Sequence, residues 1–266
     1  MTQGAASLSA DVVAILETAD PMAKSARAMR LAERWPKVTA AAIGDRPPPT
    51  RSGRPERPEL LAPGKGPRRR INRGIKGRVA LLHALAHIEL NAIDLACDII
   101  ARFAAVPNLP MAFFDDWIAV ASDEARHFRL LNARLSDFEA AYGDLPAHDG
   151  LWEAAENTAH DLLARLAVVP LVLEARGLDV TPEMIRKLRE AEDEESAGIL
   201  EVIHRDEISH VAAGQRWFAY LCKERRVEPA ETFHAMVKRY FKGELKPPFN
   251  RQSRDLAGVP EAYYSH

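Results

Sequence analysis

Two pentapeptides with the same spelling, Asp123-Glu124-Ala125-Arg126-His127 and Asp206-Glu207-Ile208-Ser209-His210, determine how the rest of the chain is interpreted. Each reads D-E-x-x-H and lies in a stretch with helical hydrophobic periodicity. Residues three apart lie on one face of a helix, so the Glu and the His of each motif point in the same direction. A carboxylate and an imidazole directed at one point form half of a metal site. Two copies therefore predict a pair of metal ions.

A di-metal helical bundle needs one further carboxylate from each of two other helices, and the sequence offers one candidate for each. Glu89 lies in the middle of an apolar helical stripe formed by Leu82, Leu85, Ala86, Ile93 and Ala96. Glu174 is the only charged residue in the run 166–175 (LAVVPLVLEA). A lone ionised carboxylate is costly to bury unless a cation compensates it. Both positions therefore favour metal ligation.

The spacing of these residues repeats. Glu89 precedes Glu124 by 35 residues, and Glu174 precedes Glu207 by 33. A pair of helices carrying first Glu and then Glu-x-x-His thus occurs twice, as a bundle with two-fold symmetry would produce. The expected roles are bridging for Glu124 and Glu207, terminal for Glu89 and Glu174, and one metal each for His127 and His210.

A second set of residues is expected around the ligands. Asp123 and Asp206 each precede a ligand Glu, and ligating histidines usually donate their other ring N–H to a carboxylate. We predict that Asp123 supports His210 and that Asp206 supports His127, with ordinary exposed acids as the alternative. Arg126 is expected to neutralise these aspartates. His204, three residues before Glu207, is either an additional ligand or a hydrogen-bond donor to the site.

The rest of the sequence predicts an all-α protein, because the alternation of apolar and polar residues that is typical of strands is nearly absent. Ser9 is expected to cap the first helix, and Asp20-Pro21 to begin a second that ends near Trp35. Four long helices are expected at 76–105, 111–141, 150–176 and 181–225, followed by another at 228–242. The predicted domains are N-terminal helices (1–43), a basic Pro/Gly/Arg-rich arm (44–75), a four-helix bundle (76–225), and a C-terminal helix with an extended, wrapping tail (226–266).

The arm has a strong charge imbalance. Between Gly44 and Arg78 there are eleven Lys or Arg residues against three acids. Arg68-Arg69-Arg70, Arg73, Lys76 and Arg78 can contact the phosphates of RNA or of a nucleotide, but no aromatic residues are interleaved for base stacking. Folding back onto acidic residues of the same chain is the favoured interpretation.

Composition excludes several classes. The formal charge of -2 argues against a polyanionic partner for the whole chain. Cys97 and Cys222 form no C-x-x-C motif, which argues against rubredoxin-type iron and structural zinc. No membrane-spanning run or secretion signal is expected, and a cytoplasmic location is the simplest. A polar stripe (His83, His87, Asn91, Asp94 and Asp98) predicts a hydrogen-bonded helix contact, with a substrate or proton-relay role as the alternative.

The ligand set resembles that of the ferritin-like di-iron carboxylate superfamily. Asp123-Glu-Ala-Arg-His127 matches the D-E-x-R-H spelling of the bacterial multicomponent monooxygenases, whereas the second copy has Ser209 in place of the Arg. The wider sequence, from Lys76 to Phe249, is similar to an uncharacterised bacterial family of ferritin-like proteins. His83-Ala-Leu-Ala-His87-Ile-Glu89, Phe113-Phe-Asp-Asp-Trp117, 142–152 (YGDLPAHDGLW) and Glu174-Ala-Arg-Gly-Leu-Asp179 carry this likeness. The resemblance implies a fold and a metal site but no substrate.

The predicted function is an O₂- or peroxide-dependent oxidoreductase or hydroxylase with two iron ions, or manganese instead. Its small-molecule substrate and its electron donor are unknown. The alternatives are an iron-handling or peroxide-scavenging protein without an organic substrate, and a metal-free scaffold. Regulatory contact with RNA through the arm ranks last.

Overall fold

The structure, a computed structural model, describes residues 7–35, 43–62, 65, 67, 69, 71, 72 and 74–265. Within these residues every regular element is helical, apart from one isolated bridge between Leu60 and Ala147. The prediction of an all-α chain is confirmed. The chain divides into two compact units. Unit 1 comprises Met1–Arg68 and Val79–Asp149, and unit 2 comprises Arg69–Arg78 and Gly150–His266.

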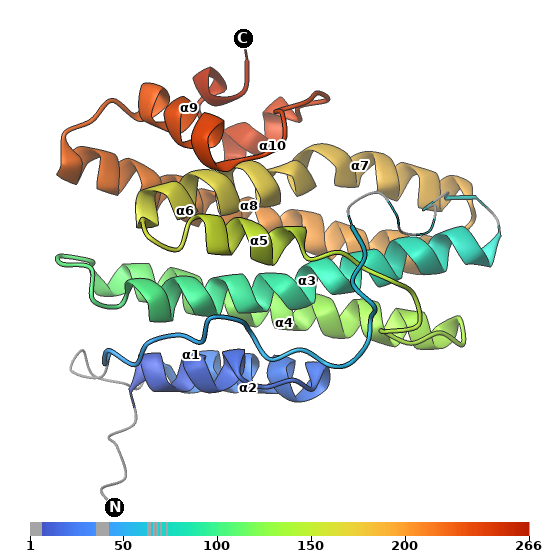
Figure 1. Cartoon of the computed structure of the whole chain (residues 1–266). Coiled ribbons are helices and arrows are strands. Elements are labelled where there is room, and N and C mark those ends of the chain that lie inside the picture. The colour runs from blue at the N-terminus through green and yellow to red at the C-terminus, as the bar shows by residue number, and fades with distance from the viewer. Residues whose placement is uncertain are drawn as a thin grey trace, which may run out of the picture. The chain divides into compact units, whose positions relative to one another are not determined.

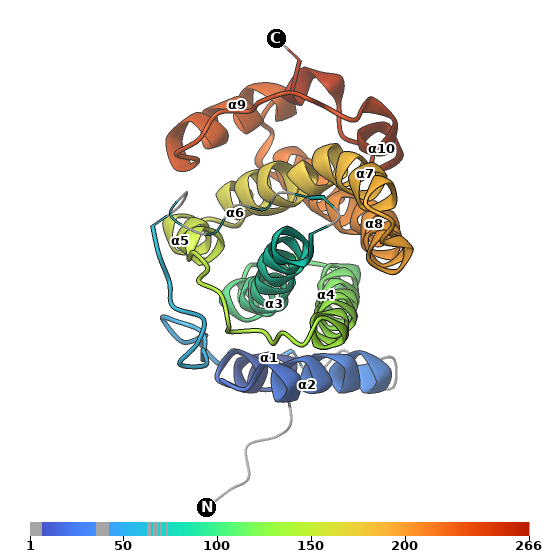
Figure 2. The ribbon, with the colours of Figure 1, turned by 90° about the vertical axis from the view of Figure 1, so that its right-hand side faces the viewer.

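Unit 1 contains two short and two long helices (Figure 1). These are α1 (Leu8–Leu16), α2 (Pro21–Arg34), α3 (Ile75–Phe103, in this unit from Val79) and α4 (Met111–Asp137). Figures 1 and 2 show α1 and α2 lying along the α3–α4 pair. Leucine, isoleucine and phenylalanine side chains of all four helices are buried, and they form the core of this unit.

The ends of the first two helices follow the local capping rules. Asp20 accepts a hydrogen bond from the backbone N–H of Ala23 at 2.7 Å, and Pro21 begins α2, as predicted. The prediction that Ser9 caps α1 is wrong, because Ser7 does so by accepting from the N–H of Ala10. Ser9 lies one residue inside α1, and its hydroxyl accepts from the backbone N–H of Arg46 instead. The hydroxyl of Ser9 is therefore bonded to Arg46, a residue distant in sequence, and does not cap the helix.

The polar stripe of α3 is buried and hydrogen-bonded. His83 Nε2 lies 2.9 Å from the N–H of Gly143, and His87 Nδ1 lies 2.9 Å from the hydroxyl of Tyr142. Burial, aided by the charge of Arg54, lowers the pKa of His87 to about 4. The predicted helix–helix contact occurs at Asp94, which pairs with Lys24 of α2. The two histidines contact the loop after α4, which sequence periodicity does not reveal.

The basic arm folds back on acidic residues of its own unit, as favoured from sequence. Arg54 approaches Asp94 at 3.2 Å, Arg46 approaches Glu17 at 3.8 Å, and Arg51 pairs with Asp149. Arg68, Arg70 and Arg73 lie outside the described residues. The phosphate-binding role of Arg68, Arg69, Arg70, Arg73, Lys76 and Arg78 stays a prediction.

Unit 2 is built on the antiparallel pair of its two longest helices, α7 and α8. Its elements are α5 (Gly150–Asn157), α6 (Leu162–Val168), the π-helical turn η3 (Val169–Glu174), α7 (Ala175–Glu190), α8 (Glu194–Arg225), α9 (Pro229–Tyr240), α10 (Arg251–Leu256) and the 3₁₀ turn η4 (Glu261–Tyr263). The helices α6 and α7 and the turn η3 all pack on α8, while α9 packs on α6 and α10 packs on α7. In Figure 1 these elements run from yellow to red.

The predicted boundary between the third and fourth long helices is wrong. Gly177 was expected to end one helix and Thr181-Pro182 to begin the next, but α7 runs through both positions. Pro182 has no N–H for the carbonyl of Leu178 one turn earlier. That carbonyl instead accepts from the side-chain amide of Asn250 at 3.1 Å and lies 3.3 Å from His204 Nε2. Side chains from outside α7 thus make an internal proline tolerable, and the helix breaks only before Asp193, the cap of α8.

The C-terminal tail is fastened to the start of α7. The guanidinium of Arg254 donates two hydrogen bonds of 2.8 Å to the carboxylate of Asp179. Both side chains are almost fully buried. Arg176 adds hydrogen bonds to the carbonyls of Lys246 and Pro248. The tail, expected to be extended, forms the short helix α10 because these contacts hold it.

One described helix, α3, is long and apolar enough to cross a membrane by length and composition, which the sequence reading did not anticipate. In the structure 78% of its apolar window is buried. It also carries His83, His87, Glu89, Asp94 and Asp98 along this length. A buried core helix passes the same test, so this finding is weak evidence for a membrane span.

Replacing Asp94 should destabilise unit 1 strongly. Lys24 and Asp94 are 1% and 0% exposed, so Asp94→Ala leaves a buried ammonium without its carboxylate. We expect a loss of about 3–5 kcal/mol in the free energy of unfolding, measured by urea titration with circular dichroism. Asp11→Ala is the matched control, because its partner Arg34 is 54% exposed, and it should cost about 0–1 kcal/mol. Equal losses in the two variants would contradict the prediction.

Candidate metal centre

Unit 1 brings together three of the predicted ligands, Glu89 of α3 with Glu124 and His127 of α4, which we call half-site 1. His127 Nδ1 lies 3.2 Å from a carboxylate oxygen of Glu89 and 3.6 Å from one of Glu124. One potential ligand atom from each residue lies within 4.8 Å of the others. All three side chains are buried. The predicted pairing of Glu89 with the first D-E-x-x-H motif is therefore present as a compact group of oxygen and nitrogen donors.

Half-site 1 has an apolar setting because of the helical stripe that surrounds Glu89. Leu82, Ala86, Ile93 and Ala96 on the same face of α3 are all buried. Burial, together with the charge of Glu124, raises the pKa of Glu89 to about 8. Such a setting disfavours a bare carboxylate, so positive charge at this point stabilises the ionised form.

His127 supplies that charge when no metal is bound. Burial alone would lower its pKa, but the contacts with the carboxylates of Glu124 and Glu89 outweigh burial and raise the pKa to about 11. At neutral pH the imidazole is therefore protonated, and so is the carboxyl group of Glu89. A metal ion would replace these protons, since metal ligands must be deprotonated.

Unit 2 carries the corresponding residues, Glu174, Glu207 and His210, which we call half-site 2. Glu207 and His210 lie on the same face of α8, and His210 Nδ1 is 3.7 Å from the Glu207 carboxylate. Both are buried. Glu174 is half-buried and is the last residue of η3, which packs directly on α8. Each unit therefore contains one Glu on its own element and one Glu-x-x-His on a long helix.

The π-helical turn places Glu174. Pro170 is the second residue of this π-helical turn, which runs from Val169 to Glu174. π-turns inside helices recur at functional sites because the extra residue redirects side chains. Pro170 rests on Gly214 of α8, where a Cβ atom would lie 2.4 Å from the proline Cβ. Gly214 is one turn beyond His210, so the close approach of η3 to α8 occurs next to half-site 2. Sequence inspection missed Gly214, although a glycine inside a helix is itself a signal.

The residues predicted around the ligands have contacts within their own units. Arg126 donates to Asp123 at 2.9 Å, and its neutralisation of both aspartates stays a prediction. Asp206 pairs with Arg205 at 3.2 Å. The proposed support of His210 by Asp123 and of His127 by Asp206 stays a prediction.

His204 has a different setting from the one expected. Its Nε2 lies 3.3 Å from the carbonyl of Leu178 and 3.4 Å from the hydroxyl of Ser253. These contacts link α8 to α7 and α10. The first gives a partner to the carbonyl of Leu178, which has none within α7 because Pro182 lacks an N–H. The two contacts do not support a role as ligand or donor at the site, which stays a prediction.

Comparison with known proteins places the chain in a family. Residues 17–265 match the family described as "Protein of unknown function (DUF455)". The chain belongs to the DUF455 family. An "Uncharacterized protein" of Haemophilus influenzae is 42% identical over 211 residues, which are 78% of this chain and 73% of that relative. No solved structure matches the chain. All six predicted ligands lie inside the part that matches DUF455.

Filling the space at Gly214 should disturb half-site 2 of this DUF455 protein. Gly214→Ala puts a methyl group against the rigid ring of Pro170, and we expect a loss of about 1–3 kcal/mol in stability. We also expect a lower metal content, because η3 ends at Glu174. Gly198→Ala is the control on the same helix, where a Cβ meets nothing within 4 Å. It should gain up to about 1 kcal/mol. Thermal unfolding and metal analysis of both variants decide it, and a stabilised Gly214→Ala protein would refute the role of this contact.

Proposed function

We propose that this DUF455 chain is a di-metal carboxylate protein whose two half-sites supply the ligands of two metal ions. The observation that carries the proposal is the occurrence, in each unit, of buried Glu and His side chains on otherwise apolar helix faces. Ferritin-like bundles use the same donors: one Glu from each of two helices and one Glu-x-x-His from each of two others. The six proposed ligands are Glu89, Glu124, His127, Glu174, Glu207 and His210.

The donor set suits iron, with manganese as the second choice. Carboxylate oxygen with imidazole nitrogen is the ligand mixture of non-haem iron sites, and manganese accepts the same oxygen donors. The two cysteines are buried, and burial raises the pKa of both the Cys97 and the Cys222 thiol, so thiolate ligation is disfavoured. The chemistry that a bound iron pair supplies is the reduction of O₂ or of peroxide.

The protein's own residues have three tasks in this proposal. Glu89 and His127 hold protons in the metal-free state and release them on metal binding. The apolar stripe of α3 keeps water away from half-site 1. Asp123 and Asp206 would orient the two histidines by accepting their second ring N–H. On this basis the proposed activity is O₂- or peroxide-dependent oxidation or hydroxylation of a small organic substrate, with electrons from a separate donor.

Metal analysis tests the proposed ligands. We expect about two iron ions per wild-type chain after anaerobic loading, and at most half as much in Glu124→Ala, which removes a proposed bridging ligand. Glu224→Ala is the control, because it removes an exposed Glu from α8 without touching a half-site. Both variants should keep the wild-type circular dichroism. Unchanged iron in Glu124→Ala would remove the centre as proposed.

The reaction with oxidants tests the proposed activity. Protein loaded with two ferrous ions should be oxidised by O₂ or by peroxide faster than the same concentration of free ferrous iron, as followed by optical absorption. Glu124→Ala should lose this acceleration, and Glu224→Ala should keep it. A wild-type protein that binds two irons and resists both oxidants would refute the oxidoreductase proposal while leaving the metal centre intact.

A further inference from the structure

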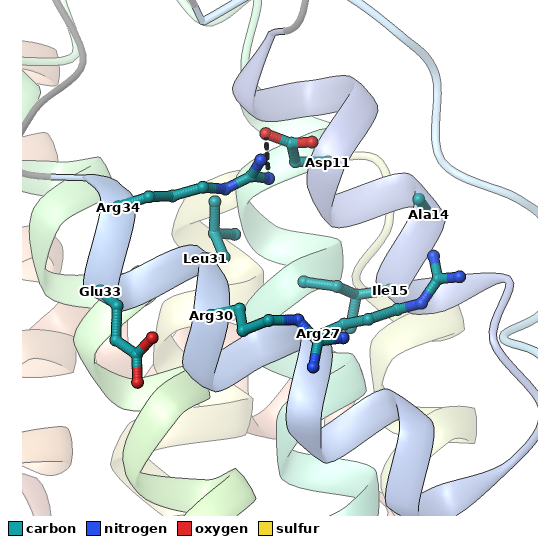
Figure 3. A pocket seen from close by; sticks show the side chains of 8 residues that line it. All are labelled: Asp11, Ala14, Ile15, Arg27, Arg30, Leu31, Glu33 and Arg34. Carbon is teal, nitrogen blue, oxygen red and sulfur yellow. Dashed lines mark ion pairs between the residues drawn. The ribbon is translucent and has the colours of Figure 1, made fainter.

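A cleft of about 560 Å³ lies between α1 and α2 in unit 1, away from the residues of half-site 1 (Figure 3). Its floor includes Ile15 and Leu31, which are 2% and 3% exposed. Three arginines of α2, Arg27, Arg30 and Arg34, line the cleft at successive turns of the helix. The cleft therefore combines an apolar base with a concentration of positive charge.

Only one of these arginines is neutralised. Arg34 forms a 2.6 Å ion pair with Asp11 across the cleft (Figure 3). Among the residues that the structure describes, neither Arg27 nor Arg30 has a side-chain hydrogen bond or ion pair. The residues outside the description include no Asp or Glu, so this comparison covers every acidic side chain of the chain. No acidic side chain of the chain forms an ion pair with either of these two guanidinium groups.

Several other arginines of the chain do have acidic partners. Arg46, Arg51 and Arg54 of the arm each reach an acid of their own unit, and Arg186 and Arg189 of α7 pair with nearby glutamates. Glu33 lies three residues after Arg30, the spacing at which ion pairs form on a helix, yet its carboxylate points away from both free guanidinium groups (Figure 3). Two like charges one helical turn apart repel each other unless an anion lies between them.

We propose that the α1–α2 cleft binds a small organic anion whose phosphate or carboxylate group is held by Arg27 and Arg30 and whose apolar part rests on Ile15 and Leu31. Guanidinium groups present forked N–H donors that match the oxygens of both anions. Ala14 and the methylene stems of the arginines, which also line the cleft, add apolar contact area that an inorganic ion cannot use. This site is independent of the proposed metal centre, because no residue of either half-site lines the cleft.

Phenylphosphonate is the probe, with benzoate, inorganic phosphate and phenol for comparison. Titrations followed by NMR of the ¹⁵N-labelled full chain should show saturable shifts at α1 and α2 for phenylphosphonate or benzoate. The better of these two identifies the preferred anionic group. Inorganic phosphate should bind more weakly because it lacks the ring, and phenol more weakly because it lacks the charge.

The variants locate the binding. Arg27→Gln/Arg30→Gln should weaken binding of the preferred ligand by about tenfold or more, because both charge-assisted contacts are lost. Arg186→Gln/Arg189→Gln removes the same charge at the same spacing from α7 and should leave affinity unchanged. Glu33→Gln should strengthen binding, because it removes a negative charge from the cleft.

Three results would overturn the proposal. The first is the absence of saturable binding of both phenylphosphonate and benzoate to the wild-type chain. The second is an equal loss of affinity in the two double variants, which would indicate general charge attraction. The third is Arg27- and Arg30-dependent binding to phosphatidylglycerol vesicles without binding of either small anion, which would assign the surface to anionic lipid.

Discussion

An ionised carboxylate on a buried helix face needs positive charge beside it, and this requirement organises both units. Asp94 meets Lys24 and Arg54, and Asp179 meets Arg254 and Arg176. In these places permanent cations fix the N-terminal helices, the arm and the tail to the long helices. Glu89, Glu124 and Glu207 meet imidazoles instead. An imidazole can surrender its proton to make room for a metal, whereas guanidinium and ammonium groups cannot. The kind of cation beside each acid separates structural carboxylates from candidate ligands.

Much of this was readable from sequence because the signals are local. The Asp20-Pro21 start of α2, the lengths of α3 and α4, and the positions of Glu89 and the two D-E-x-x-H motifs depend on helical period and capping. The predictions of helix ends fail where a residue distant in sequence supplies a hydrogen-bond partner that the local rules do not take into account. Asn250 and His204 satisfy the carbonyl that Pro182 leaves open, so α7 continues where a break was expected. The backbone N–H of Arg46 donates to the hydroxyl of Ser9, and Ser7 caps α1 instead.

The candidate site shows the same division. An acid in an apolar stripe is visible in sequence, so Glu89 was identifiable, and so was Glu174. The position of Glu174 depends on more than its sequence neighbours. It follows from a π-helical turn whose proline meets a glycine on another helix, 44 residues further along the chain. The spacing of His204 puts it on the same helix face as Glu207, but its imidazole lies beside the carbonyl of Leu178 in α7. Helical spacing tells which residues can converge, and packing decides which ones do.

The helix α2 shows how one element serves two electrostatic purposes. Lys24 lies at the edge of its buried stripe, beside Ala28 and Leu31, where Asp94 of α3 provides the opposite charge. Arg27 and Arg30 follow at steps of three residues, and each step turns about 60° back around the helix, which moves them out of reach of α3. Both side chains line the cleft between α2 and α1, and the single acid of α1 at this cleft is already paired with Arg34. If the same balance of charge that holds inside the protein also holds at this surface, the counter-ion for Arg27 and Arg30 has to come from a ligand.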